Sequence, residues 1–268
     1  MNLNLIKELQ SRGIVKIDNF LVEKEKEKVK EIIKFYSAPK GHKDSYFPIS
    51  MKSLILKLLK LNFTKLKHSY YILNLSKKKK LNLISDKIFE KKSYLGFIDG
   101  YYSMISDKDV LPWHTDQAYK SDEKNISGFV HPDHAFLKFF IYLTDVGPDD
   151  GCMSYIPESH KIGYAIRKGI FEKKIEYESY WSLKDFRKII SNKKNINFFK
   201  NYFNDSNLID EFLEKTNFIE KNEETKDFDY KMPAGGAIIF NEGGVHKGSK
   251  TLYNNRMVLR FLFSIKKN

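Results

Sequence analysis

The sequence predicts a mainly β fold of the sandwich or jelly-roll class, flanked by helices. Short apolar or β-branched stretches, bounded by turns that contain glycine and proline, fill two separate parts of the chain. Charged segments with helical periodicity precede the first part and separate it from the second. We therefore expect a single domain over residues 1–268, with a β core in two pieces and a helical insertion that acts as a lid. The expected parts are 1–92 (helical N-terminal part), 93–164 and 229–268 (β core), and 165–228 (insertion).

The first 92 residues are expected to be mostly helical. Apolar residues recur at helical spacing along three stretches, and lysines occupy the opposite face of the third. Gly13 ends the first of these helices, and the β-branched stretch Ile14–Ile17 that follows predicts a short strand. The three expected helices span residues 3–12, 22–36 and 51–92.

The β core is expected to consist of short strands. The stretch 136–143 is a continuous apolar run with β-branched and aromatic members, which is typical of a buried strand. Turn-forming residues are densest in Asp145–Gly151, directly after it. The expected strands span residues 94–105, 112–118, 136–143, 153–156, 229–232, 237–241 and 256–265.

The composition of the chain bounds its partners. Hydrophobic residues make up 41% of the 268 residues, enough for a sizeable core. The formal net charge is +13, but only five of the 47 basic residues are arginine. Arginine is the side chain that reads guanine edges and forks onto phosphates, so its scarcity argues against a nucleic-acid partner.

The sequence indicates a cytoplasmic protein without a membrane span. Its one cysteine, Cys152, excludes an internal disulfide and fits a reducing compartment. The N-terminal residues lack the basic and then apolar layout of a signal peptide. The most apolar stretch, Ala135–Leu143, contains Lys138 and is far too short to cross a bilayer.

A histidine and an aspartate two residues apart are candidates for a metal site, and the chain contains this pattern three times. The three pairs are His42/Asp44, His114/Asp116 and His131/Asp133. The first lies in a polar loop, and a proline interrupts the third. Only the second lies in a stretch that can be extended, where residues two apart point to the same face. The sequence therefore predicts that His114 and Asp116 project together.

A third ligand is expected from the end of the chain. His246 follows an apolar strand and two glycines that permit a tight turn. Two histidines and one carboxylate on one face of a metal are diagnostic of non-haem Fe(II) oxygenases, because they leave positions open for co-substrates and oxygen. We therefore expect His114, Asp116 and His246 to bind iron.

Two arginines lie four residues apart in the apolar stretch after His246. Arg256 and Arg260 would share one face of a strand, and an arginine that points into an apolar core needs a partner. A dicarboxylate co-substrate is a suitable partner, because guanidinium binds carboxylate through two parallel hydrogen bonds.

The chain resembles the phytanoyl-CoA dioxygenase family of Fe(II)/2-oxoglutarate-dependent oxygenases. The motif W-H-x-D at 113–116 and the motif G-x-x-H at 243–246, with an arginine after it, are part of the resemblance. It covers most of the chain except roughly residues 40–90 and 165–229. The other matching blocks are Leu9–Leu21, Leu137–Val146, Gly151–Met153, Ile156–Gly163 and Pro233–Phe240.

The resemblance implies a double-stranded β-helix core of the jelly-roll, cupin-like type. It implies Fe(II) held by His114, Asp116 and His246, with 2-oxoglutarate on the iron and its far carboxylate on Arg256. Family members often place this arginine one residue later, so Arg260 is the alternative. The implied reaction uses O2 to hydroxylate an unactivated C–H bond of a small-molecule metabolite, with release of succinate and CO2. A cupin-like protein that binds a metal or ligand without oxidising anything is the alternative function.

Three further features have two interpretations each. Gln117 and Tyr119 follow the metal pair and could face the substrate or simply pack. Lys138 could point inward, near the co-substrate, or toward solvent. The aromatic residues of the insertion could line the site as part of a lid, or build a helical pack or a dimer contact.

Overall fold

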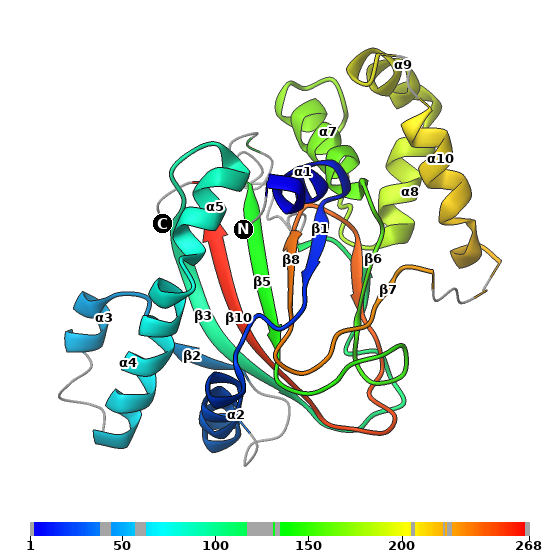
Figure 1. Cartoon of the computed structure of the whole chain (residues 1–268). Coiled ribbons are helices and arrows are strands. Elements are labelled where there is room, and N and C mark those ends of the chain that lie inside the picture. Colours follow the sequence, from blue (N-terminus) through cyan, green and yellow to red (C-terminus); the bar gives the residue numbers. More distant parts are fainter. Residues whose placement is uncertain are drawn as a thin grey trace.

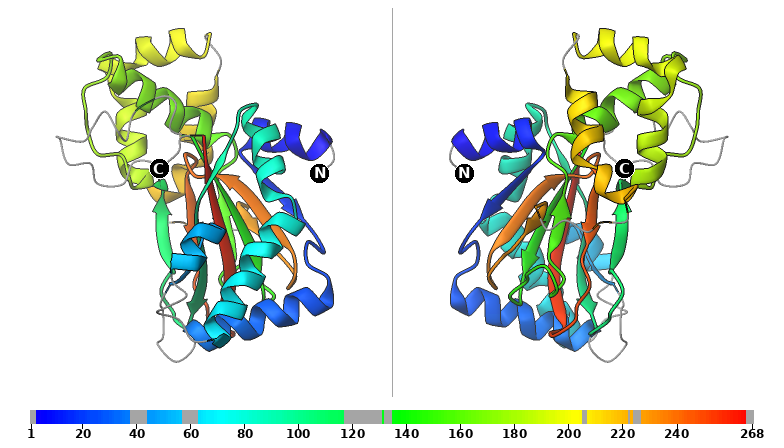
Figure 2. Two further views of the ribbon diagram at one scale, coloured as in Figure 1. Left: turned by 90° about the vertical axis from the view of Figure 1, so that its left-hand side faces the viewer. Right: turned by 90° about the vertical axis from the view of Figure 1, so that its right-hand side faces the viewer.

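The computed structural model describes residues 3–37, 44–56, 63–116, 131, 135–204, 207–221, 223 and 227–265. Two antiparallel sheets pack face to face, and helices cover one of them and gather at one end of both (Figures 1 and 2). Helices hold 44% of the residues and strands 25%, so helix outweighs strand although the core is a β sandwich. Within the described residues the sheets do not close into a barrel. The predicted jelly-roll architecture with flanking helices is confirmed.

The larger sheet has six strands and forms the centre of the molecule (Figure 1). Alternate residues of its strands point to opposite faces, so one face meets the N-terminal helices and the other meets the second sheet. In spatial order the strands are β1 (Ile14–Ile17), β8 (Ala237–Asn241), β5 (Phe136–Tyr142), β10 (Arg256–Ser264), β3 (Tyr94–Ser103) and β2 (Ser45–Phe47).

The smaller sheet has four short strands and lies against the inner face of the larger one. Its order is β4 (Leu111–His114), β9 (His246–Gly248), β6 (Met153–Tyr155) and β7 (Asp229–Tyr230). Phe140 and Phe240 from the large sheet and Tyr155 from the small sheet meet in one apolar cluster between them. The ring centroids of Phe140 and Phe240 are 5.0 Å apart, in the edge-to-face geometry that aromatic pairs favour.

The N-terminal helices cover the outer face of the large sheet. Val29, Ile32 and Ile33 form the buried stripe of one helix and pack against residues such as Phe261 of β10. Figure 1 shows these helices in blue to cyan. They are α1 (Leu3–Arg12), α2 (Glu23–Ser37), α3 (Met51–Leu56), α4 (Phe63–Lys78) and α5 (Leu81–Phe89). The helices expected over 3–12, 22–36 and 51–92 are therefore present, the last as three pieces.

The helical segment between the two pieces of the core has an apolar cluster of its own, in which Phe186 and Ile166 are fully buried. It gathers at one end of the sheets (Figure 2). Its elements are α7 (Ser159–Phe171), α8 (Leu183–Ser191), α9 (Lys193–Tyr202), α10 (Leu208–Lys215) and the short 3₁₀ helix η4 (Asn217–Ile219). Helix begins at Ser159 rather than at the expected residue 165, because Ile162, Ala165 and Ile166 already form a buried helical stripe.

Several strands differ from the expectation. β4 ends at His114 rather than at residue 118, and β3 ends at Ser103 rather than at residue 105. β2 and β9 lie where no strand was expected. Both have only three residues, and each is a strand because it pairs with strands far away in sequence. β2 pairs with β3, and β9 pairs with both β4 and β6.

Among the described helices, none combines the length and the apolar character needed to cross a membrane.

Candidate metal centre

Two histidines face each other across paired strands of the small sheet. His114 is the last residue of β4, and His246 is the first residue of β9 and its register partner. The centroids of their rings are 4.4 Å apart, and both side chains are buried. The two glycines before His246 form the expected turn, which ends at Gly244, and pairing with β4 and β6 makes His246 part of a strand that was not expected.

Backbone carbonyls fix the orientation of both rings. Nδ1 of His114 lies 2.6 Å from the carbonyl oxygen of Pro112, and Nδ1 of His246 lies 2.9 Å from that of Gly244. A carbonyl can only accept, so each Nδ1 carries a proton and Nε2 is the ring nitrogen that is left to face a metal. This is the outer hydrogen bond that metal-binding histidines typically make.

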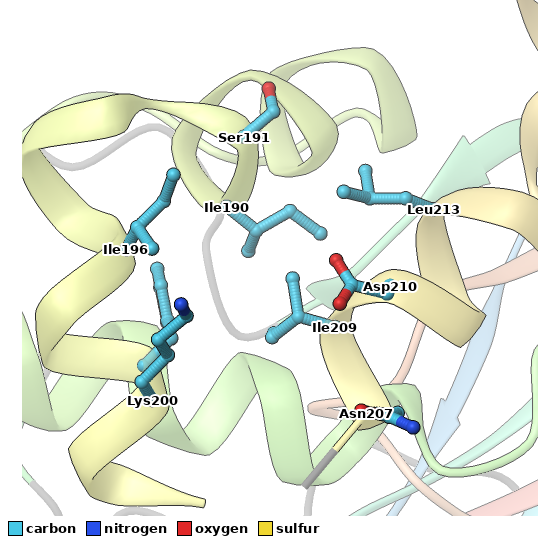
Figure 3. A pocket seen from close by; sticks show the side chains of 9 residues that line it. Ile190, Ser191, Ile196, Lys200, Asn207, Ile209, Asp210 and Leu213 are labelled. Carbon is cyan, nitrogen blue, oxygen red and sulfur yellow. The ribbon is translucent and has the colours of Figure 1, made fainter. Parts of the chain in front are cut away.

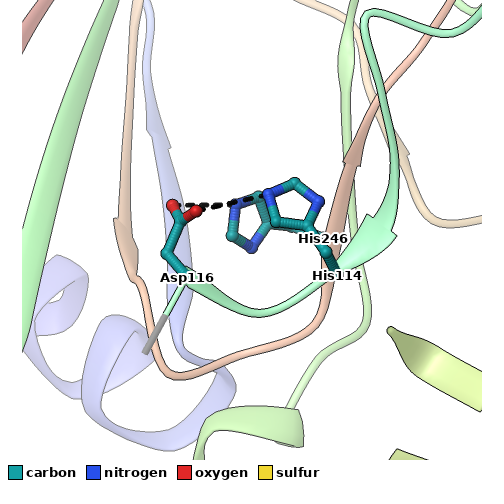
Figure 4. Close-up of side chains that lie close together, drawn as sticks. All are labelled: His114, Asp116 and His246. Carbon is teal, nitrogen blue, oxygen red and sulfur yellow. Dashed lines mark ion pairs between the residues drawn. The ribbon is translucent and has the colours of Figure 1, made fainter. Parts of the chain in front are cut away.

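Asp116 brings a carboxylate to both Nε2 atoms (Figure 4). Its Oδ1 lies 3.3 Å from Nε2 of His114, and its Oδ2 lies 3.4 Å from Nε2 of His246. One ligand atom from each of the three residues lies within 4.8 Å of the others. The chain leaves the strand after His114, so Asp116 reaches the centre from a turn and not from the predicted strand face. Thr115 points away, as expected, and donates a hydrogen bond to the carbonyl of Glu242.

The electrostatics of Asp116 and His246 favour the forms that bind metals. Burial opposes ionisation of Asp116, but Lys138 and the two histidines outweigh it and hold the pKa of the carboxyl well below its usual range. Burial lowers the pKa of His246, which keeps that imidazole neutral. An ionised carboxylate beside a neutral imidazole is the donor set that a divalent transition metal requires.

A buried lysine and a second buried carboxylate lie behind Asp116. Lys138 points inward from β5, its Nζ is 2.6 Å from Oδ2 of Asp116, and it also pairs with Glu242. Of the two interpretations of Lys138, the structure shows the inward one. Burial raises the pKa of the Glu242 carboxyl and the neighbouring Asp116 adds to that, while Lys138 opposes both.

A cavity of about 140 Å³ opens beside the three side chains. Arg256 and Arg260 both line it, as does Tyr101, so the prediction that the two arginines share one inward face is confirmed. The guanidinium carbons of Arg256 and Arg260 lie 5.5 and 4.7 Å from the centroid of the Tyr101 ring. The cavity is small and positively charged, and it suits a compact anionic ligand.

The two arginines differ in what already binds them. Arg260 is held by Asp99, with Nε 2.8 Å from Oδ1, and by Asp44 at 2.9 Å. Arg256 is 4% exposed and donates to the carbonyl of Gly151 at 2.9 Å, but its Nε has no hydrogen-bond partner among the described residues. A buried donor without an acceptor is costly, and the carboxylate of a bound ligand would satisfy it.

The remaining predicted residues lie elsewhere or outside the described residues. Gln117 and Tyr119 fall outside them, as do His42 and Asp133. Asp44 pairs with Arg260, and His131 stacks edge-on against Phe171, with ring centroids 5.0 Å apart. Neither of the other two histidine–aspartate pairs is described as a whole.

The insertion contributes directly to the wall of the centre. The ring of Trp181 lies over His114, with centroids 5.3 Å apart, and its carbonyl accepts a hydrogen bond from the amide of Thr115. Ser182 forms an isolated β-bridge with His114. Other aromatic residues of the insertion, such as Phe186 and Phe199, pack in its own core. The aromatic residues of the insertion are therefore divided between the wall of the site and a helical pack.

A second cavity lies within the insertion and is unrelated to the metal centre. It measures about 540 Å³ and lies between α8, α9 and α10 (Figure 3). Ile190 and Leu213 give it apolar walls, with Lys200 and Asp210 also lining it. No histidine or cysteine lines it, so it offers one carboxylate, that of Asp210, and none of the imidazoles of the first site.

Glu242 and Tyr101 are site residues that the sequence interpretation missed. Glu242 directly follows the apolar strand β8 and is almost fully buried, which is rare for a carboxylate unless it is paired, as Glu242 is with Lys138. Its position between an apolar strand and two glycines could have identified it in the sequence as a buried site residue. Tyr101 gave no such signal, because it is one of several aromatic residues in a long strand.

Comparison with known proteins supports these observations. The sequence model of the family described as "Phytanoyl-CoA dioxygenase (PhyH)" matches residues 9–252. No curated protein sequence matches the chain.

Solved structures of the same fold are known at low sequence identity. HygX from Streptomyces hygroscopicus, solved with nickel and 2-oxoglutarate, is 12% identical with a TM-score of 0.57, over 98% of this chain and 86% of HygX. SnoK, a non-haem α-ketoglutarate-dependent carbocyclase of nogalamycin biosynthesis, is 13% identical with a TM-score of 0.55, over 98% and 84%. The epimerase SnoN, solved with Fe3+, α-ketoglutarate and a nogalamycin, is 11% identical with a TM-score of 0.56, over 97% and 82%.

Proposed function

The chain belongs to the phytanoyl-CoA dioxygenase (PhyH) family of 2-oxoglutarate-dependent oxygenases, and we propose that it hydroxylates an unactivated C–H bond of a small-molecule metabolite. The observation that carries the proposal is the convergence of His114, Asp116 and His246 from two segments far apart in sequence. Two imidazoles and one carboxylate on one side of a metal leave its other side open.

The residues present fit Fe(II). Both Nε2 atoms are directed at the Asp116 carboxylate, and the backbone holds both rings in the tautomer that binds a metal. We assign all three side chains as ligands. With 2-oxoglutarate bound, the metal supplies the oxidising chemistry, in which O2 converts 2-oxoglutarate to succinate and CO2 and adds one oxygen atom to the substrate.

The residues present also fit 2-oxoglutarate. Arg256 lines the cavity that the three proposed ligands also line, and its Nε has no partner among the described residues, so the far carboxylate of the co-substrate would accept from its guanidinium. Arg260 is already neutralised by Asp99 and Asp44, so we assign the carboxylate to Arg256. The small cavity leaves little room for water beside the co-substrate.

The substrate would enter over the wall that the insertion builds. Trp181 packs on His114, which gives the insertion a direct contact with the reacting centre. HygX has been solved with hygromycin B bound, and this supports a small-molecule substrate for the present chain as well. We propose that the whole chain works as one domain, with the insertion as its lid. We also propose a cytoplasmic location, because the single cysteine is free and buried.

A second oxidative outcome uses the same site. The structural neighbours include a carbocyclase and an epimerase, so C–H activation in this fold does not always end in hydroxylation. The mass of the product separates the two outcomes, because hydroxylation adds one oxygen atom and ring closure or epimerisation does not. A protein that binds metal without oxidising anything would release no succinate.

Succinate formation tests the proposal. The purified protein, given Fe(II), 2-oxoglutarate and O2, should release succinate slowly, and faster when the true substrate is present in a screened metabolite pool. Asp116→Asn should abolish release, whereas Asp210→Asn, in the separate cavity of the insertion, should leave it unchanged. Equal succinate release from the wild type and Asp116→Asn, or no succinate from either protein in any pool, would contradict the proposal.

A further inference from the structure

Lys138 and Glu242 form a buried ion pair that directly touches a metal ligand. Lys138 is 9% exposed and Glu242 is 6% exposed. Charged residues this buried are rare unless they are paired, and removing one partner from such a pair is strongly destabilising. Apolar residues of similar volume are often at least as stable as a buried ion pair. Stability alone therefore does not explain the pair, and we look for its role in the chemistry of the centre.

The strand register places the two side chains side by side. Lys138 on β5 is the register partner of Phe240 on β8, and Glu242 lies two residues beyond Phe240 on the same face. The amide of Glu242 donates to the carbonyl of Phe136 at 3.2 Å, which extends the pairing past the end of β8. Both side chains therefore point toward the centre from a rigid part of the sheet.

Glu242 also connects the two segments that carry the ligands. Its carbonyl accepts from the hydroxyl of Thr115 at 3.1 Å, between His114 and Asp116. It begins the turn that leads to His246. Its carboxyl lies against Asp116 as well as against Lys138. A second carboxylate thus lies next to the cluster, joined to Asp116 through Lys138, although it is not one of the three residues whose ligand atoms lie within 4.8 Å of one another.

A second carboxylate on the metal would obstruct the proposed reaction. 2-Oxoglutarate and oxygen need the open positions that two histidines and one carboxylate leave. The Nζ of Lys138 lies 2.6 Å from Oδ2 of Asp116 and also pairs with Oε1 of Glu242, so the lysine donates to both carboxylates at once. Its hydrogen bond to Oδ2 of Asp116 leaves Oδ1 for the metal.

We propose that Lys138 is a positioning residue that holds Asp116 to one-oxygen coordination and keeps Glu242 off the metal. The role rests on the proposed function, because it presumes that the three side chains bind iron. It concerns the number of open positions on the metal and not the presence of the metal itself.

The test compares four proteins without substrate: the wild type, Lys138→Met, Glu242→Gln and the double variant Lys138→Met/Glu242→Gln. Co(II) serves as the metal, because its visible spectrum reports the ligand set. Its affinity and that of 2-oxoglutarate for the Co(II) protein are measured by calorimetry. Thermal melting of each protein reports the fold separately.

Lys138→Met should keep Co(II) affinity or increase it, because a positive charge is lost and Glu242 is freed to bind. It should change the Co(II) spectrum and weaken 2-oxoglutarate binding at least about 10-fold, the scale of outer-shell effects at metal sites. The double variant should regain 2-oxoglutarate binding to within about threefold of wild type, because a glutamine at 242 donates to Asp116 but competes poorly for metal.

Glu242→Gln leaves Lys138 with Asp116 as its one carboxylate partner in the cluster, so Co(II) affinity should fall roughly 10-fold or more. The proposal is overturned if Lys138→Met keeps the wild-type spectrum and 2-oxoglutarate affinity. It is also overturned if the double variant stays as weak as Lys138→Met, which would mean that Lys138 binds the co-substrate itself. If all variants only melt earlier, the pair is merely structural.

Failure of the proposed function looks different. In that case the wild type would bind Co(II) no better than His114→Ala, and the four proteins could not be compared at this site. The effect of Lys138 is therefore interpreted only after Co(II) binding has been measured for the wild type and shown to be lost in His114→Ala.

Discussion

His114 and His246 lie opposite each other in the antiparallel pair β4–β9, although 131 residues separate them along the chain. The pairing places both Nε2 atoms next to one carboxylate, at 3.3 and 3.4 Å. The candidate metal centre is thus built on a strand register, and any change that shifts β9 against β4 separates the proposed ligands.

Metal binding should stabilise the wild type and not a ligand variant. A ligand that binds only the folded state at 100 times its Kd adds about 2.7 kcal/mol. Adding Ni(II) under anaerobic conditions should therefore raise the melting temperature of the wild type by several degrees and leave that of His246→Ala unchanged. His131→Ala, outside the three ligands, is the control and should respond like the wild type. A similar response from His246→Ala would show that the ion binds elsewhere.

Arg256 and Arg260 should give different defects. Arg256→Lys removes the forked donor, so 2-oxoglutarate should bind at least about tenfold more weakly, a loss of about 1.4 kcal/mol, with little change in the free energy of unfolding. Arg260→Lys keeps the charge but disturbs the pair with the fully buried Asp99. Arg260→Met breaks the pair, which should cost about 3–5 kcal/mol of folding stability. Calorimetric titration and urea denaturation measure the two quantities, and the reverse pattern would make Arg260 the co-substrate residue.

Gly13 should tolerate no side chain. Its φ of +81° lies in the left-handed region, and a Cβ there would overlap His160 and Tyr155. Gly13→Ala should lower the free energy of unfolding by about 1–3 kcal/mol, because both strain and overlap act. Gly147→Ala is the matched control, since a Cβ at that position would meet nothing within 4 Å. Equal denaturation midpoints for the two variants would contradict the expectation.

Glu25 should contribute stability that depends on pH. Burial opposes ionisation of its carboxyl, but hydrogen bonds from Lys78 and Lys79 outweigh this and lower its pKa from 4.5 to about 2. A group whose pKa is lower in the folded state stabilises the fold above its unfolded pKa, and this contribution is lost as pH falls from about 4.5 toward 2.

Glu25→Gln should therefore cost on the order of 2 kcal/mol at pH 7, less than the full shift implies because Lys78 is largely exposed. The difference from wild type should shrink when denaturation is repeated near pH 3. Glu31→Gln on the same helix removes only an exposed pair with Lys28 and should change little at either pH. A cost for Glu25→Gln that stays constant with pH would rule out the ionised carboxylate as its origin.

The sequence by itself determined the elements whose pattern is local. Apolar spacing located α1, α2 and the helical stretch that holds α3 to α5, and the apolar runs located β5 and β8. It also determined that Arg256 and Arg260 share a face, because alternation along one strand needs no partner. The choice of His114, Asp116 and His246 required only residue types, their strand context and the resemblance to a family.

Only the tertiary structure decided what depends on pairing between distant segments. It gave strand structure to His246, directed Lys138 inward and brought Glu242 against Asp116. It also distinguished the two arginines, because Asp99 lies opposite Arg260 on the neighbouring strand while nothing described accepts from Nε of Arg256. These relationships follow from the register between strands far apart in the chain, and a periodic pattern within one strand carries no information about which residue will face it.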